Sequence, residues 1–267
     1  MPDRLQPQRF ERKYFLSEPQ AARVREFVRA YLVPDEHGAG APDGAYPVHS
    51  LYLDSDYLTT YWATVHCEKS RFKLRLRYYD DDPESPVFFE IKRRMNECIF
   101  KQRGAVRKSA AALLVAGHLP ESGHLLGHQP SHLVTLQRFG RLMQVLAARP
   151  KMHVAYEREA WVHPDTDAVR VTLDRHVRGE ATPTVRLTTE LVRPARPFGA
   201  NVVLELKYTN RFPDWFGDLV RHFSLVQNGA PKYCGSVASV GADRLSGPLP
   251  ALRSHPAPRL AEMEKYF

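Results

Sequence analysis

The sequence predicts an α+β protein built on an antiparallel β-barrel that forms a tunnel, with helices packed outside. Many short segments alternate between polar and apolar residues, and they fall into two sets with helical segments inserted between them. Charged side chains recur at every other position of these segments. Because residues i, i+2 and i+4 of a strand share one face, the charges lie opposite the apolar side chains. Closure of the sheet would turn the charged faces toward one lumen.

The expected strands share this alternation, and they span residues 8–16, 48–54, 71–79, 87–94, 98–106, 152–162, 169–177, 184–192 and 201–209. A helix is expected after Ser17, which has the residue type of an N-cap, with Pro19 in the first turn. Further helices are expected from Asp54 or Ser55 to Trp62, from about Ser109, from Ser131 to Ala148, and from Pro213 to about Leu225. Residues 34–46, rich in Gly, Pro and Asp, are expected to form a loop.

One domain is expected over residues 1–245, followed by a proline-rich tail at 246–267. The three cysteines, Cys67, Cys98 and Cys234, are far apart and odd in number, so we expect reduced thiols and a cytoplasmic location. The N-terminus lacks the apolar region of a signal peptide, and no apolar run approaches the ~18 residues of a membrane span. A membrane role would therefore require a membrane-protein partner.

The charged face is mainly cationic. In the segment 71–77, Arg71, Lys73, Arg75 and Arg77 alternate with Phe72, Leu74 and Leu76. The same parity places together Glu11 with Lys13, Glu90 with Lys92, Lys101 with Arg103, Tyr156 with Arg158, Arg170 with Asp174, and Glu205 with Lys207. A one-sided sheet with a solvated charged face would explain any single strand. Two like charges ~5 Å apart repel by roughly 3 kcal/mol at an effective dielectric constant near 20, so a closed lumen of this kind favours a bound polyanion.

A chain of phosphates suits such a lumen. The net charge of +8 indicates a polyanionic partner without identifying it. Arginine pairs with phosphate oxygens bidentately, and the interspersed glutamates could hold Mg²⁺ or Mn²⁺ that bridges phosphate oxygens. Proteins that bind single-stranded nucleic acid usually carry aromatic side chains for base stacking on their basic face. Here Phe72, Phe89 and Phe100 alternate with the cationic residues and lie on the opposite face. We therefore expect no specific nucleic-acid partner.

An ordered series of motifs resembles a known family. RFERKYF (9–15) carries the Glu-x-Lys element of triphosphate tunnel metalloenzymes, the CYTH-like superfamily. With KLRLRYY (73–79), FFEIKRR (88–94), YEREAW (156–161), VRVTLD (169–174), LELKYT (204–209) and PKYCGSV (231–237), the chain resembles the VTC domain. That domain is the catalytic polyphosphate polymerase domain of the vacuolar transporter chaperone complex and of its free-standing bacterial relatives. One departure is Pro231, where the family often has serine before the Lys-Tyr pair.

The resemblance implies an enzyme, a phosphotransferase that moves the γ-phosphate of ATP onto a growing inorganic polyphosphate chain with Mn²⁺ or Mg²⁺ as cofactor. It implies that the catalytic cations are Lys13, Arg75, Arg77, Lys92, Arg158 and Lys232. The further phosphate-binding residues are Lys101, Tyr156 and Arg170, to which the shared strand faces add Lys207 and Arg71. It implies Glu205 as metal ligand, with Glu11 or Glu90 as additional ligands.

Two other functions stay open at this point. The chain could be another tunnel enzyme that hydrolyses inorganic or nucleoside triphosphates, which would release free phosphate instead of a polymer. It could also be a non-catalytic module that binds polyphosphate. No Gly-x-x-x-x-Gly-Lys-Ser/Thr loop is present, so the sequence does not predict a P-loop nucleotide site.

Overall fold

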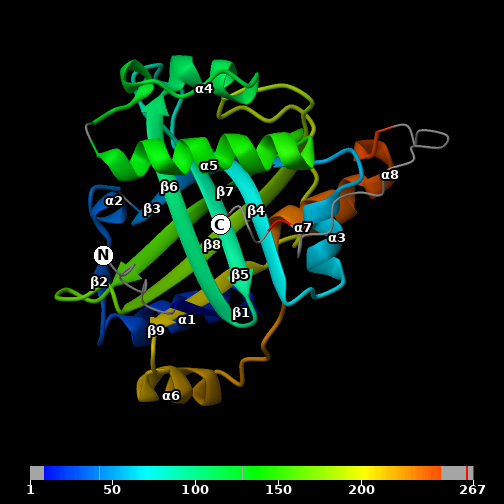
Figure 1. Ribbon diagram of the computed structural model, residues 1–267. Coiled ribbons are helices and arrows are strands. Elements are labelled where there is room, and N and C mark those ends of the chain that lie inside the picture. The colour runs from blue at the N-terminus through cyan, green and yellow to red at the C-terminus, as the bar shows by residue number, and fades with distance from the viewer. Residues whose placement is uncertain (1–8, 42, 128, 248–262, 264–266) are drawn as a thin grey trace.

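The computed structural model describes residues 9–41, 43–127, 129–247, 263 and 267. Its centre is a ring of eight antiparallel strands in the order β7-β3-β4-β5-β6-β1-β9-β8, which the pairing of β8 with β7 closes (Figure 1). The strands span Arg9–Leu16 (β1), Ala45–Asp54 (β3), Ser70–Tyr78 (β4), Pro86–Met95 (β5), Cys98–Arg107 (β6), Arg149–Val162 (β7), Val169–Ala181 (β8) and Val202–Thr209 (β9). The predicted antiparallel tunnel with helices outside is confirmed.

The helices lie outside or at the ends of this ring. They span Glu18–Val28 (α1), Glu36–Ala39 (α2), Thr59–Val65 (α3), Lys108–Val115 (α4), Pro130–Leu146 (α5), Asp214–His222 (α6), Lys232–Val240 (α7) and Ala242–Leu245 (α8), with a 3₁₀ turn at Ser122–His124 (η1). Ser17 caps α1 as predicted, because its side chain accepts from the Gln20 amide and the Gln20 side chain accepts from the Ser17 amide. A short strand, β2 (Val33–Pro34), pairs with the end of β7.

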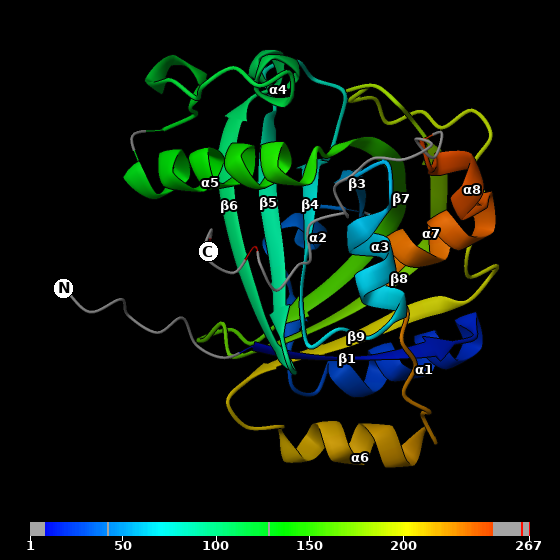
Figure 2. The same cartoon turned by 45° about the vertical axis from the view of Figure 1, so that its right-hand side comes forward.

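Two layers of apolar side chains pack between the outer face of the ring and the helices. Leu74 and Leu76 of β4 and Ile91 of β5 pack beneath α4 and α5 with Phe139 and Leu142. The outward residues of β1, β8 and β9 form a second layer with α1 and α6, in which Leu204, Leu206 and Phe216 are buried. Figure 2 shows α5 across β4, β5 and β6, and α1 and α6 beneath β1 and β9. With the outer faces buried, the charged positions of the same strands point inward.

One end of the ring is filled by a third apolar cluster. Met152 and Val154 of β7 and Val203 of β9 point inward there and pack with Tyr233 and Val237 of α7 and with Leu58, just before α3. Figure 1 shows α3 and α7 at this end and α2 at the opposite end. The inward charged residues therefore lie between the end of the ring that α3 and α7 cover and the opposite end, near α2.

Several expectations for local structure were wrong. Residues 184–192 form no strand; they run irregularly over the outer face, where Tyr78 donates to the Thr188 carbonyl and the Thr189 amide donates to Asp81. Just after this segment, Ala195 forms an isolated bridge with Gly179 of β8. Residues 34–46 contain β2 and α2 as well as loop.

Two helix starts also differ from the prediction, and α7 was not predicted. The helix expected from Asp54 or Ser55 begins at Thr59, because the buried Asp54 carboxylate accepts from the amides of Thr60 and Tyr61. The N-cap of α5 is Gln129, followed by Pro130, instead of Ser131. Most of the expected tail, residues 248–262 and 264–266, lies outside the described residues. None of the helices in the described ranges has the length and apolar composition that a membrane span requires.

A neutral histidine pair is buried under the segment 184–192. His49 Nδ1 of β3 lies 3.1 Å from His153 Nε2 of β7, and the Tyr78 hydroxyl lies 3.0 Å from the same His153 nitrogen. Burial, with the nearby Arg178 guanidinium, lowers the pKa of His49 to about 4. Burial, His49 and Arg178 lower the pKa of His153 to about 3.

The histidine pair should make the fold acid-sensitive. An unfolded histidine has a pKa near 6.5, so on acidification the unfolded chain takes up protons before the folded one does. The contribution to stability is therefore complete above pH about 6.5, and each histidine removes up to about 1.4 kcal/mol per pH unit as the pH falls below it. Urea unfolding between pH 7.5 and 5 measures this slope. His153→Gln should flatten it, whereas His66→Gln, at an exposed position, should not. An unchanged slope in His153→Gln would contradict the assignment.

Candidate active site

Most of the predicted site residues meet inside the ring. Contacts between strands that are not neighbours demonstrate this: Lys92 of β5 lies 3.0 Å from Glu11 of β1, and Arg77 of β4 donates to the Tyr156 hydroxyl of β7 at 3.1 Å. The strand period that predicted a shared face is therefore correct for these residues.

The Glu205 carboxylate is the centre of the charge network. Its Oε1 atom lies 2.8 Å from Lys232 Nζ and 3.1 Å from Lys13 Nζ. Its Oε2 atom lies 2.6 Å from Lys207 Nζ and 3.4 Å from the Arg158 guanidinium. Burial alone would raise the pKa of Glu205, but the surrounding cations, led by Lys13, hold this pKa well below its ordinary value. Glu205 is therefore ionised and balances several cations at once.

Asp174 is a second buried carboxylate at this centre, and it was not among the predicted site residues. It binds Arg158 bidentately, at 2.7 and 2.8 Å, and lies 2.5 Å from Lys232. Lys232 comes from the first position of α7, directly after Pro231, so the helix points this ammonium into the ring. The signal for Asp174 was present in its shared parity with Arg170, but a single Asp in a strand did not indicate its partners.

A second cluster forms around Glu90 of β5, which is fully buried. Arg75 lies 2.6 Å from Glu90 Oε2, and Lys101 lies 2.7 Å from Glu90 Oε1. Arg75 also donates to the Tyr52 hydroxyl at 3.0 Å. Burial opposes ionisation of Glu90, but the charges of Arg75, Arg77 and Lys101 hold its pKa well below the ordinary value.

Glu11 lies beside the first cluster. Its carboxylate bridges Lys13 at 2.9 Å and Lys92 at 3.0 Å. The charges of these two lysines outweigh the effect of burial and lower the pKa of Glu11.

Lys73 donates to Thr64 of α3 at 2.6 Å. It was predicted to lie on the charged face but was not among the predicted site residues. Burial lowers the pKa of Lys73.

Two predicted residues lie at the ends of the ring. Arg170 lies 2.5 Å from Asp35, beside α2, and donates to the Tyr46 hydroxyl at 3.3 Å. Arg71 donates to the Glu68 carbonyl between α3 and β4. The structure thus separates these two arginines from the central clusters.

The repulsion expected between the inward cations is reduced by carboxylates that point into the same ring. The described cations still outnumber the inward carboxylates, which are Glu11, Glu90, Asp174 and Glu205. A polyanion that enters would therefore meet a positive surplus, and its oxygens could replace the carboxylates as partners of lysine and arginine.

The buried carboxylates could ligate a divalent cation only together with oxygens of a bound phosphate. Glu11 and Glu205 converge on the Lys13 ammonium, and Asp174 and Glu205 converge on that of Lys232, so these carboxylates already surround positive charge. Among the described residues, no group of three or more His, Cys, Asp or Glu side chains is arranged to hold a metal. Mg²⁺ is commonly bound by one or two carboxylates plus substrate phosphates, and Glu205 with Glu11 fits that pattern. Glu90 binds Arg75 and Lys101 in a separate cluster.

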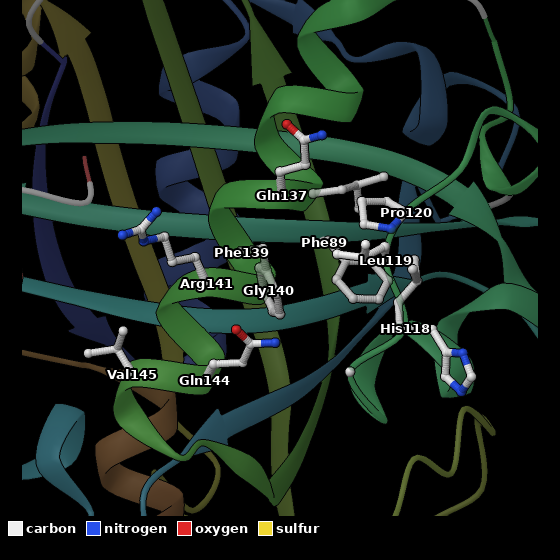
Figure 3. A pocket seen from close by; sticks show the side chains of 13 residues that line it. Phe89, His118, Leu119, Pro120, Gln137, Phe139, Gly140, Arg141, Gln144 and Val145 are labelled. Atoms are coloured by element: carbon white, nitrogen blue, oxygen red, sulfur yellow. The ribbon is translucent and has the colours of Figure 1, made fainter.

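A cavity outside the ring is separate from these charges. It has a volume of about 410 Å³ and lies between α4, α5 and β5, where Phe89, Leu136 and Phe139 line it (Figure 3). His118, Gln137 and Gln144 supply polar groups at its walls. None of the predicted phosphate-binding residues lines it, so we do not assign it to a triphosphate.

The fold and the charged interior define a tunnel protein, in which a closed antiparallel ring surrounds lysine, arginine and glutamate side chains. The chain belongs to the VTC domain family, whose sequence pattern matches residues 8–241.

Three solved structures match the chain at low sequence identity. A proposed adenylate cyclase from Bacillus halodurans has 12% identity and a TM-score of 0.45, over 84% of this chain and 93% of that chain. The PH1819 protein from Pyrococcus horikoshii has 10% identity and a TM-score of 0.43, over 88% and 99%. The Mimivirus capping enzyme triphosphatase has 11% identity and a TM-score of 0.33, over 82% and 90%. No curated protein matches the sequence significantly.

Arg75 should contribute to stability as well as to ligand binding. Arg75→Ala leaves the buried Glu90 with Lys101 at 2.7 Å and Arg77 at 4.0 Å but without its closest guanidinium. We expect the free energy of unfolding to fall by roughly 1–3 kcal/mol, and tripolyphosphate to raise the melting temperature less than in the wild type. Arg75→Ala combined with Glu90→Gln should recover part of the lost stability, because no uncompensated carboxylate stays behind. A single variant that is more stable than the wild type would contradict this pairing.

Proposed function

We propose that this protein is a polyphosphate polymerase that transfers the γ-phosphate of ATP to the end of an inorganic polyphosphate chain. Membership of the VTC domain family and a charged interior together support an enzyme that acts on triphosphates. The observation that carries the proposal is the double cluster of buried cations around Glu205 and Glu90, which offers partners for several consecutive phosphates.

The reaction needs positioning and charge stabilisation more than covalent help from the protein. A terminal oxygen of the polyphosphate attacks the γ-phosphorus, and the bond from this phosphorus to the β–γ bridging oxygen breaks. The electron pair stays on the leaving ADP, and the polymer becomes one phosphate longer. No nucleophilic side chain is required, because the acceptor phosphate is the nucleophile.

The lysines and arginines have distinct parts in this proposal. Arg75 and Arg158 present planar guanidinium groups that can bind two phosphate oxygens each. Lys13 and Lys232 each contact Glu205 and a second carboxylate, so a phosphate oxygen could replace Glu205 at these ammonium groups while the second carboxylate stays bound, as charge develops during transfer. The Tyr156 hydroxyl accepts from Arg77, and its own hydrogen could be donated to a phosphate oxygen.

Glu205 would hold Mn²⁺ or Mg²⁺ together with Glu11 and substrate phosphate oxygens. A bound divalent ion would neutralise charge on the transferred phosphoryl group. Lys13 and Lys232 must shift from Glu205 to allow this, and the phosphates themselves offer them new partners.

Triphosphate hydrolysis is a second candidate, and one observation favours it. The apolar packing of α3 and α7 covers one end of the ring, so among the described residues a long polyphosphate has no straight path through both ends. A short triphosphate needs only one open end.

Incubation of the purified protein with ATP and Mn²⁺, followed by gel sizing of any polyphosphate, separates these functions. The proposal predicts long polymer and ADP. Stoichiometric orthophosphate without polymer would assign hydrolysis instead.

Glu205→Gln should abolish turnover with Mn²⁺, because the amide keeps the size of the side chain but lacks the charge a metal ligand needs. The variant should also be less stable, since four cations lose their shared carboxylate, so turnover is measured at a temperature at which circular dichroism shows that it is folded. We expect a loss of at least about 100-fold in rate, in line with the loss of charge stabilisation in the transition state. Glu84→Gln, at an exposed loop position, is the matched control. Full turnover in Glu205→Gln, with an unchanged dependence on Mn²⁺ concentration, would exclude Glu205 as the metal ligand.

Affinity should grow with the number of phosphates and then level off. Each phosphate that reaches the cations can make charge-assisted hydrogen bonds worth roughly 1.5–3 kcal/mol apiece before desolvation costs. Calorimetry should therefore rank orthophosphate, pyrophosphate and tripolyphosphate in increasing affinity, with weak binding of duplex DNA at physiological salt. Equal affinity for pyrophosphate and tripolyphosphate, or displacement of tripolyphosphate by duplex DNA, would show that the cations do not act as one site.

A further inference from the structure

Aromatic side chains gather at the end of the ring near α2. The ring centroids of His37 and Tyr79 lie 5.8 Å apart with planes 23° from parallel, and those of His37 and Tyr46 lie 5.3 Å apart. Tyr79 also contacts Phe88, at 6.2 Å and close to perpendicular. Tyr46, Tyr79 and Phe88 are half-buried and His37 is exposed, so these rings are not enclosed in a core.

The strand parity places these rings on the charged face. Tyr79 follows Arg75 and Arg77 at the same parity, and Phe88 precedes Glu90 at the same parity. The phenylalanines of the opposite face, Phe72, Phe89 and Phe100, gave no indication of these rings. Tyr46 is the second residue of β3, Tyr79 follows the end of β4, and Phe88 lies near the start of β5, so antiparallel pairing brings all three to one end of the ring.

The spacing along β4 connects this end to the phosphate-binding cations. Measured along β4 at ~3.3 Å per residue, Arg77 lies about 7 Å and Arg75 about 13 Å from Tyr79. A nucleoside triphosphate that enters base-last would bring its phosphates to these arginines while its base stays level with the aromatic rings.

We propose that His37, Tyr46, Tyr79 and Phe88 form a stacking site for the base of a nucleoside triphosphate. This inference rests on the proposed function and adds the residues of this chain that hold the base of the nucleotide donor. Arg103, whose guanidinium carbon lies 4.8 Å from the centroid of the Phe88 ring, supplies a second planar group beside the site. The Tyr46 hydroxyl already binds Asp35 and Arg170, so stacking, which every base can make, dominates over base-specific hydrogen bonds. ATP and GTP should therefore bind with similar affinity.

Calorimetry with ATP and tripolyphosphate in EDTA, where turnover is suppressed, tests the base site separately from the phosphate site. Tyr79→Ala should weaken ATP about tenfold, and tripolyphosphate less than about twofold, because only ATP carries a base. Tyr79→Phe should bind ATP like the wild type, since the ring is kept. Tyr31→Ala, which removes a half-exposed ring stacked on Trp215 elsewhere on the surface, is the matched control. If Tyr79→Ala does not fold, Phe88→Ala takes its place.

The outcomes separate the two proposals. Equal weakening of both ligands, or unchanged ATP affinity, in Tyr79→Ala would overturn the base site while leaving the triphosphate site intact. A wild-type protein that binds neither ligand would overturn the proposed function, and the base site with it.

Discussion

The structure depends on one electrostatic constraint: charges that the strands direct into the ring must be balanced inside it. Glu205 meets this constraint by contacting Lys13, Lys207, Lys232 and Arg158 within 3.4 Å. A buried carboxylate of this kind is tolerated only when its partners are close and hydrogen-bonded. The same carboxylates raise the pKa values of Lys13, Arg75 and Arg158 against the effect of burial, whereas burial lowers the pKa of Lys101 to about 7. The protein therefore maintains a cationic interior without a ligand. A phosphate chain can then replace carboxylate oxygens one contact at a time.

The apolar layers fix where these charges lie. Burial of Leu74, Leu76 and Leu204 on the outer face leaves Arg75, Arg77 and Glu205 only the inward direction. Lys232 is placed differently, because it comes from α7. The Tyr233 hydroxyl donates to Asp54 at 2.8 Å, and Asp54 also accepts from the amides of Thr60 and Tyr61. This buried carboxylate thus ties α7 to α3 and holds the first residue of α7 against the charge network.

Sequence alone predicted the features that follow the two-residue period of a strand. The alternation from Arg71 to Arg77 predicted both β4 and the inward face of its arginines, because one side of that strand is entirely apolar. The same signal failed at residues 184–192, which alternate in polarity but form no strand. The partners of Asp174 could not be predicted, because they depend on ring closure and on a lysine from a helix. The aromatic cluster was missed for a related reason, since Tyr46, Tyr79 and Phe88 meet only through pairing of three strands.

A crystal structure with tripolyphosphate and Mn²⁺ tests the central claim most directly, because anomalous scattering locates the ion independently of the phosphates. The account predicts phosphates among Lys13, Arg75, Arg158 and Lys232, with Mn²⁺ on Glu205 and with Lys232 turned from Glu205 toward a phosphate oxygen. Phosphates bound outside the ring, with Glu205 still held by its four cations, would contradict it.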